Sequence, residues 1–258
     1  MTVGTPENLK RNIMSKLYNL GCSFAYGNCA PRRNKLCNEH KGPGTYIAKY
    51  LDRKEVNLAR NGNSIDGVLR RLYTYDFEKD GIVLIGVPPS GRFQVVGHEE
   101  QIYNKERAYK SSIFGKTNEA QKCIRYAYTK GPATRGDYFH TLKWAEVTSE
   151  HINETSSYHV LFNILKIQTR LKELGLKYYI YNSIGFKHNP KNEETKKIKE
   201  QIDWSYYYKP EYSMFDMVLS NVEYELAEGD QHPNHYAYEE WSNAVSYTHL
   251  RAHETTCH

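Results

Sequence analysis

The sequence predicts a three-layer α/β sandwich built around a central parallel sheet. Short apolar segments typical of strands alternate with segments whose apolar residues recur at helical spacing. This alternation favours parallel strands joined by right-handed crossover helices. The continuous apolar run at residues 81–87 is typical of a central strand covered on both faces. With 258 residues, 39% of them hydrophobic, the chain is long enough for one such domain with a full core.

The individual elements follow from local patterns. Strands are predicted at residues 17–20, 55–59, 81–87 and 178–181. Helices are predicted at residues 44–51, 64–73, 158–174, 192–202 and 236–244. Ser64 is placed to cap the start of its helix, and Gly175 stands where the longest helix should end. Because ligands bind beyond the carboxyl ends of parallel strands, the loops that follow these strands are the places to search for a site.

Two segments are set apart from this pattern. Residues 97–151 are polar and weakly periodic, and we expect them to form an insertion over one end of the sheet within a single domain at residues 1–244. Residues 245–258 resemble the translated read-through of a transposase sequencing adapter. We therefore expect this tail to be artefactual, the source to be an assembled environmental sequence, and the natural C-terminus to be missing.

Composition narrows the class of protein. The formal net charge is +5, but Lys and Arg are scattered along the chain, whereas nucleic-acid binding requires them to cluster on one face. No apolar run reaches the length of a membrane span, and the first residues lack the apolar core of a secretory signal. We therefore expect a cytoplasmic protein with reduced cysteines and no membrane or nucleic-acid partner. The 23 tyrosines favour half-buried packing over a sugar- or base-stacking surface.

Three loops carry residues that suit acyl chemistry. Ser23 follows the first strand, where neighbouring backbone N–H groups can stabilise an oxyanion. Gly62 follows the second strand and permits close backbone approach. Asp230 and His232 precede the last helix, and a serine nucleophile needs such a base with an orienting carboxylate. Each loop also has an ordinary interpretation, as a helix cap, a turn or a solvated surface loop.

Taken together and in this order, the three loops resemble the SGNH (GDSL-like) hydrolase family. The resemblance is to its phage and metagenomic branch, in which the first block begins Gly-Cys-Ser-Phe, as at residues 21–24. It implies a flavodoxin-like sandwich, a catalytic triad of Ser23, His232 and Asp230, and an oxyanion hole formed by the N–H groups of Ser23 and Gly62. No cofactor or metal is implied.

The chain departs from the family pattern at three places. Cys22 replaces the usual Asp before the serine, and the third block at residues 85–92 lacks the Asn that completes the oxyanion hole. Asn63, Ser90 and Arg92 are candidates to replace that donor. The acid also stands two residues before the histidine instead of three, with Glu228 as a possible stand-in.

Other arrangements remain open. Cys22 can itself be a nucleophile, although a buried cysteine beside a strand end is the commoner case. His235 can replace His232 as base, but its place at the start of a helix favours a capping or solvated role. A zinc site would have to use the following four residues, which lack a Cys-x-x-Cys pair: Cys22, Cys29, Cys37 and His40.

The resemblance implies a serine esterase that acts on an acyl ester, with a small molecule or a glycan carrying a carbohydrate O-acyl group as substrate. The alternative is a glycan-binding module of a phage particle that keeps the fold without efficient catalysis, and this alternative would make the protein virion-associated. The missing third-block Asn favours the binding module, and the Ser, Gly and His-Pro set favours the enzyme. The sequence does not predict an oligomeric state.

Overall fold

The computed structural model describes residues 15–27, 41–61, 63–90, 152–185, 190–227 and 230–247. Within these ranges it leaves undescribed the side chains of residues 152–156, 222, 226–227 and 230–231. The predicted insertion at residues 97–151 lies outside the described residues, as does the chain after residue 247.

Five parallel strands form the central sheet, in the order β2-β1-β3-β4-β5. They are β1 (Lys16–Leu20), β2 (Lys54–Asn57), β3 (Ile82–Val87), β4 (Lys177–Asn182) and β5 (Tyr207–Ser213). This is the strand order of the flavodoxin-like doubly wound fold, in which the chain reverses direction along the sheet between β1 and β3. The predicted fold class is therefore confirmed, and the reversal point marks the edge where a ligand is expected.

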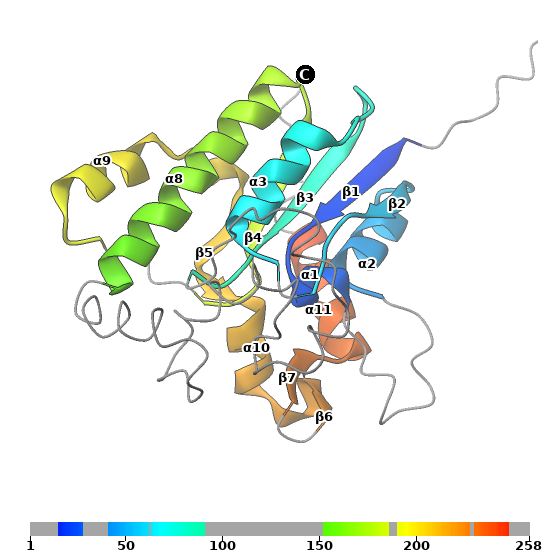
Figure 1. Ribbon diagram of the computed structural model, residues 1–258. Helices are drawn as coiled ribbons and strands as arrows, with labels where there is room; N and C mark the ends of the chain where they lie inside the picture. The colour runs from blue at the N-terminus through cyan, green and yellow to red at the C-terminus, as the bar shows by residue number, and fades with distance from the viewer. Residues whose placement is uncertain are drawn as a thin grey trace, which may run out of the picture.

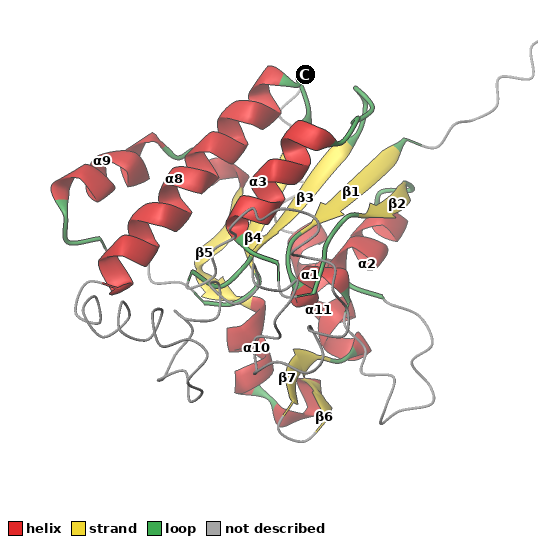
Figure 2. Cartoon of the chain, viewed as in Figure 1, coloured by secondary structure: helices red, strands yellow, loops and turns green. Residues whose placement is uncertain are grey.

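Helices cover both faces of the sheet and complete the three layers (Figures 1 and 2). One face packs against α3 (Ile65–Thr74), α8 (Ile152–Glu173) and α9 (Glu193–Gln201). The other face packs against α1 (Ser23–Tyr26), α2 (Pro43–Tyr50), α10 (Met214–Ser220) and α11 (His235–Val245). Alternate strand residues point to opposite faces, so that Tyr18 and Leu20 join the first core while Leu17 joins the second.

The caps predicted from the sequence are present. The Ser64 hydroxyl accepts a hydrogen bond from the Gly67 N–H at the start of α3. Gly175 follows α8 with φ +64°, the left-handed conformation that glycine adopts without strain. α8 begins at Ile152, earlier than the predicted residue 158. β2 ends at Asn57 instead of residue 59, where the Asn57 side chain accepts the Ala59 N–H at 3.1 Å. The Leu58 and Arg60 N–H groups still donate to the Asn19 and Gly21 carbonyls, so the chain stays beside β1 and its loop.

The sequence analysis did not predict several of the helices and strands. β5 breaks the strand pattern because Pro210 lies in its middle, Lys209 has φ +40°, and its register shifts against β4. As an edge strand it tolerates these irregularities, and the Asn182 amide on β4 donates to the Pro210 carbonyl. The others are α10, the short helical turns Trp204–Tyr206 and Val222–Tyr224, and the antiparallel hairpin of β6 (Glu225–Ala227) and β7 (Asp230–Pro233).

The last helix extends one residue into the segment that was set apart as a tail. Val245 ends α11 and is buried, four residues after the buried Trp241 and on the same side of the helix. The boundary predicted at residue 244 is therefore one residue too early for the helix. The adapter origin of residues 245–258 stays a prediction.

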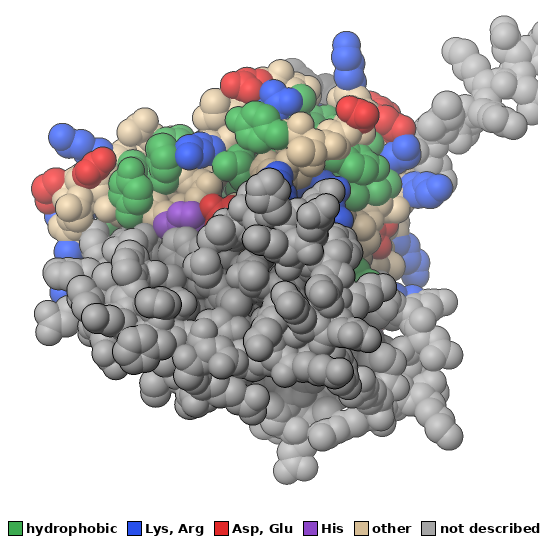
Figure 3. All heavy atoms as spheres, in the orientation of Figure 1, with side chains coloured by type: hydrophobic (Ala, Val, Ile, Leu, Met, Phe, Trp, Pro, Cys, Tyr) green, Lys and Arg blue, Asp and Glu red, His purple; other side chains and the backbone are tan. Residues whose placement is uncertain are grey.

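The described part of one face of the molecule is mixed in charge. In the face shown in Figure 3, acidic and basic side chains are interspersed with hydrophobic ones. Among the helices of the described ranges, none is both long enough and apolar enough to cross a membrane.

Candidate active site

Ser23 lies in the turn between β1 and α1, at the carboxyl edge of the sheet. It is the first residue of α1, and the residue is 6% exposed. The preceding Gly21 is held from the neighbouring loop, because the Arg60 N–H and the Asn63 amide donate to its carbonyl at 3.1 and 3.2 Å. At the other end of α1, the Asn19 amide donates to the Ala25 carbonyl at 2.7 Å. Side chains and loops on both sides therefore position the turn that carries the Ser23 hydroxyl.

Gly21 fits where a larger residue would not. Its φ of +150° is rarely adopted by other residues, and a Cβ atom would lie 2.6 Å from both the Ala25 Cβ and the Gly86 carbonyl oxygen. Gly86 is in β3, so the turn packs directly on the backbone of the neighbouring strand. This contact brings the Ser23 loop against the point where the strand order reverses.

Substitution of Gly21 by Ala should therefore destabilise the protein. We expect the free energy of unfolding, measured by urea denaturation, to fall by roughly 2–4 kcal/mol from backbone strain and overpacking. Gly175→Ala is the matched control, since Gly175 also has a positive φ but a Cβ atom there would have no neighbour within 4 Å. It should cost about 1 kcal/mol. Equal losses in the two variants would show that crowding at Gly21 is unimportant.

His232 approaches Ser23 from the other end of the chain. It lies in β7, and its Nε2 is 2.9 Å from the Ser23 Oγ across 209 residues of sequence. The Phe24 ring packs against the imidazole with a centroid separation of 5.0 Å. In Figure 1 the β6–β7 hairpin and α10 lie at the same end of the sheet as α1. The structure thus brings together the two residues that were predicted as nucleophile and base.

The junction after His232 is fixed by hydrogen bonds. Asn234 caps α11 by accepting the Ala237 N–H at 3.0 Å. Its amide donates to the carbonyls of Glu223 and Glu225, and its own N–H donates to the Tyr224 carbonyl. Pro233, between the two, is buried. These contacts tie the end of β7 to β6 and to the turn before it, and so restrict where the imidazole can lie.

The remaining predicted site residues have different outcomes. Asp230 begins β7 and its backbone pairs with Ala227, but its side chain lies outside the described part of the structure. Gly62, Arg92 and Glu228 also lie outside the described residues. Ser90 is half-buried in the turn three residues after β3.

Asn63 was one of the candidates to complete the oxyanion hole, and that role stays a prediction. Its amide donates to the Gly21 carbonyl, so this side chain helps to hold the nucleophile loop. It also lines a pocket on the side of α3. The hydrogen bond places the Asn63 amide against the loop that carries Ser23.

The alternative residues are also located. Cys22 is fully buried as the residue before α1, as expected for a structural cysteine. His235 is exposed at the start of α11, where its ring contacts the Tyr236 ring in a tilted arrangement, and Asn234 is the capping residue. Cys29, Cys37 and His40 lie outside the described residues, within which no group of His, Cys, Asp or Glu side chains could hold a metal ion.

Sequence reasoning missed the polar cluster behind the nucleophile loop. The Glu55 carboxylate accepts hydrogen bonds from the Asn19 amide at 3.1 Å and from the Thr45 hydroxyl at 2.7 Å. Burial raises the pKa of the Glu55 carboxyl, and the two hydrogen bonds oppose that rise. Asn19 links this cluster to α1 through the Ala25 carbonyl. An asparagine inside an otherwise apolar strand was the available signal, because buried polar side chains need partners.

The chain was also compared with known proteins. No family model matches it, and no curated protein matches its sequence. Among solved structures, the lipase Lip_vut3 from a goat rumen metagenome is 14% identical to this chain, with a TM-score of 0.47. The alignment covers 92% of this chain and 96% of the lipase. A GDSL-like lipase from Parabacteroides merdae ATCC 43184 is 12% identical with a TM-score of 0.42, and the alignment covers 90% of this chain and 94% of that lipase. A carbohydrate esterase is 14% identical with a TM-score of 0.41, and the alignment covers 92% of this chain and 68% of the esterase.

Proposed function

We propose that this protein is a serine hydrolase that cleaves acyl esters, with Ser23 as nucleophile and His232 as general base. The observation that carries the proposal is the 2.9 Å separation between the His232 Nε2 and the Ser23 Oγ. This is hydrogen-bonding distance, and it is the contact through which an imidazole activates a serine hydroxyl. The reaction needs no step beyond acyl transfer to the serine and then to water.

The first half of the reaction forms an acyl-enzyme. The Ser23 Oγ attacks the ester carbonyl carbon while its proton passes to the His232 Nε2. The tetrahedral intermediate then expels the alcohol, which takes the proton from the imidazolium. A water molecule, activated by the same imidazole, releases the acid and restores the free Ser23 hydroxyl.

Two further roles belong to the proposal. To accept the Ser23 proton, the His232 Nε2 must be unprotonated, so that the ring carries its proton on Nδ1 and needs an acceptor there. We assign that acceptor to the Asp230 carboxylate. We assign stabilisation of the oxyanion to the N–H groups of Ser23 and Gly62. The Ser23 N–H suits this role because the first N–H groups of a helix such as α1 have no acceptor within the helix.

For the substrate we propose an acetyl or other short acyl group, carried by a carbohydrate or another small alcohol. A glycan-binding module of the same fold is the competing function. The two functions differ in one measurable property, which is whether the Ser23 hydroxyl reacts as a nucleophile.

A reactive fluorophosphonate tests this property directly. We expect the full-length protein to hydrolyse a short-chain p-nitrophenyl ester and to lose that activity as one equivalent of fluorophosphonate is incorporated. Peptide mapping by mass spectrometry should place the adduct on Ser23. Hydrolysis that persists without an adduct on Ser23 would assign the nucleophile elsewhere. The absence of both hydrolysis and adduct would leave the binding module as the function.

A further inference from the structure

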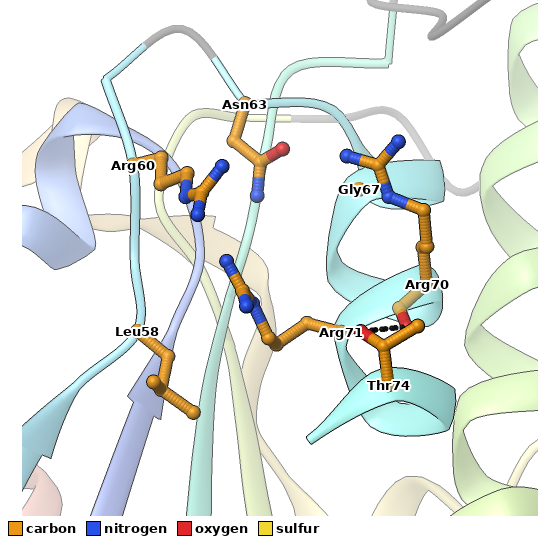
Figure 4. A pocket seen from close by; sticks show the side chains of 7 residues that line it. All are labelled: Leu58, Arg60, Asn63, Gly67, Arg70, Arg71 and Thr74. Atoms are coloured by element: carbon orange, nitrogen blue, oxygen red, sulfur yellow. Dashed lines mark hydrogen bonds between the residues drawn. The ribbon is translucent and has the colours of Figure 1, made fainter. Parts of the chain in front are cut away.

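A basic pocket lies on the α3 side of the nucleophile loop. It has a volume of about 200 Å³ and lies between α3 and the loop that follows β2. Its lining residues are Leu58, Arg60, Asn63, Gly67, Arg70, Arg71 and Thr74. Figure 4 shows the Arg60 and Arg71 side chains extending toward each other from the two walls, with the Asn63 amide beside them and the Arg70 guanidinium near Gly67.

The charge of this pocket is unbalanced. Three of its lining side chains are guanidinium groups and none is a carboxylate. Among the residues that the structure describes, no salt bridge joins Arg60, Arg70 or Arg71 to an acidic side chain. Asp66, one helical turn before Arg70, is instead paired with His159 at 3.1 Å.

The excess of positive charge affects the pKa of Arg71. Burial lowers the pKa of its guanidinium, and the positive charges of Arg60 and Arg70 lower it further. A guanidinium nevertheless stays protonated. The half-buried Arg71 guanidinium is therefore repelled by its two exposed neighbours, and a bound anion would relieve that repulsion through charge-assisted hydrogen bonds.

The pocket shares its wall with the proposed active site. Arg60, through its backbone N–H, and Asn63, through its amide, both donate to the carbonyl of Gly21, which is two residues before Ser23. A group held in the pocket would consequently lie beside the loop that carries the nucleophile. This loop is also at the reversal point of the strand order, where ligands of this fold bind.

We propose that this pocket binds a compact oxyanion, either a carboxylate, a sulfate or a phosphate group, carried by the ester substrate. The inference rests on the proposed esterase function and narrows its substrates to anionic esters. Guanidinium groups suit such ligands because they donate paired hydrogen bonds to planar or tetrahedral oxyanions. Arg60 and Arg70 are exposed, so each can be substituted without disturbing the core.

The first arm of the test measures anion binding without catalysis. Inorganic phosphate and sulfate are titrated into the full-length protein by calorimetry at constant ionic strength. Arg60→Gln and Arg70→Gln should each weaken binding by about tenfold, as expected for loss of a charge-assisted hydrogen bond. The control is Lys79→Gln, which removes one positive charge from an exposed residue outside the pocket and should leave affinity unchanged. Equal affinities in the Arg60→Gln, Arg70→Gln and Lys79→Gln variants would overturn the proposal that this pocket binds an oxyanion.

The second arm measures substrate preference. Para-nitrophenyl hemisuccinate carries its carboxylate on the acyl side and is compared with the neutral butyrate ester. Para-acetoxybenzoate carries it on the alcohol side and is compared with phenyl acetate. We expect kcat/KM to favour at least one anionic ester over its neutral partner, and Arg60→Gln to reduce that preference about tenfold. A preference that is absent, or that Arg60→Gln leaves unchanged, would overturn the substrate assignment.

The two arms separate this inference from the function on which it rests. If no ester of either kind is hydrolysed, the esterase proposal fails, and the titration still shows whether the pocket binds an oxyanion. If neutral esters are hydrolysed and the titration shows no arginine-dependent binding, the esterase proposal stands and the pocket inference fails.

Discussion

Replacement of Ser23 by Ala is expected to lower kcat/KM for a short-chain p-nitrophenyl ester by at least about 10³-fold. The reason is that Ala leaves the loop and the imidazole in place but removes the atom that forms the acyl-enzyme. Because the side chain of Ser23, at the start of α1, is small, the variant should keep its fold, with a urea midpoint close to that of the wild type. Initial rates measured over a range of substrate concentrations, corrected for spontaneous hydrolysis, give the comparison.

Cys22→Ala is the matched control for this substitution. Cys22 precedes Ser23 directly and carries the other nucleophilic atom of the turn, but it is fully buried. We expect this variant to retain most of its activity and to lose about 1 kcal/mol of stability from the small cavity that it creates. If Cys22→Ala abolished hydrolysis while Ser23→Ala retained it, the nucleophile would be the thiol.

The second large effect is expected at His232. The His232→Gln variant can still place a polar group near Ser23, but an amide cannot accept the Ser23 proton. We therefore expect kcat/KM to fall by about 10³-fold or more, and the fluorophosphonate to label Ser23 correspondingly slowly. The slowed labelling is the discriminating readout, because it reports the reactivity of the Ser23 hydroxyl itself. Circular dichroism and urea denaturation check that the variant is folded.

His235→Gln serves as the comparison for His232→Gln. His235 is three residues further along the chain and was the alternative base, but it is exposed and its ring contacts Tyr236. The His235→Gln variant should hydrolyse esters and react with the fluorophosphonate at wild-type rates. The opposite ranking of the two variants would move the general base to His235 and contradict the geometry of β7.

The sequence by itself determined the elements whose causes are local. The apolar run of β3, the Ser64 cap of α3 and the Gly175 end of α8 each depend on residues within a few positions of one another. Such interactions are already present in a short stretch of chain, so periodicity and capping rules recover them. The alternation of strands and helices then led to the parallel sheet, because the handedness of crossovers leaves few arrangements.

The tertiary structure decided what depends on distant residues. β5 is a strand only because β4 provides its partner, despite Pro210 and the positive φ of Lys209. The three arginines of the basic pocket come from a loop and a helix whose separation is set by packing on the sheet. Neither feature has a local signal, since edge pairing and pocket walls are products of the assembled fold.

The candidate site also has parts that the sequence indicates and a contact that only the tertiary structure decides. Its residue types, a serine after the first strand and a histidine before the last helix, could be identified from the sequence and from its family resemblance. The 2.9 Å contact between Ser23 and His232 could not, because it joins residues 209 positions apart. It exists because Gly21 allows the first turn to pack on β3 while Asn234 fixes the end of β7. Local chemistry thus specified the parts, and long-range packing, which no short segment encodes, placed them together.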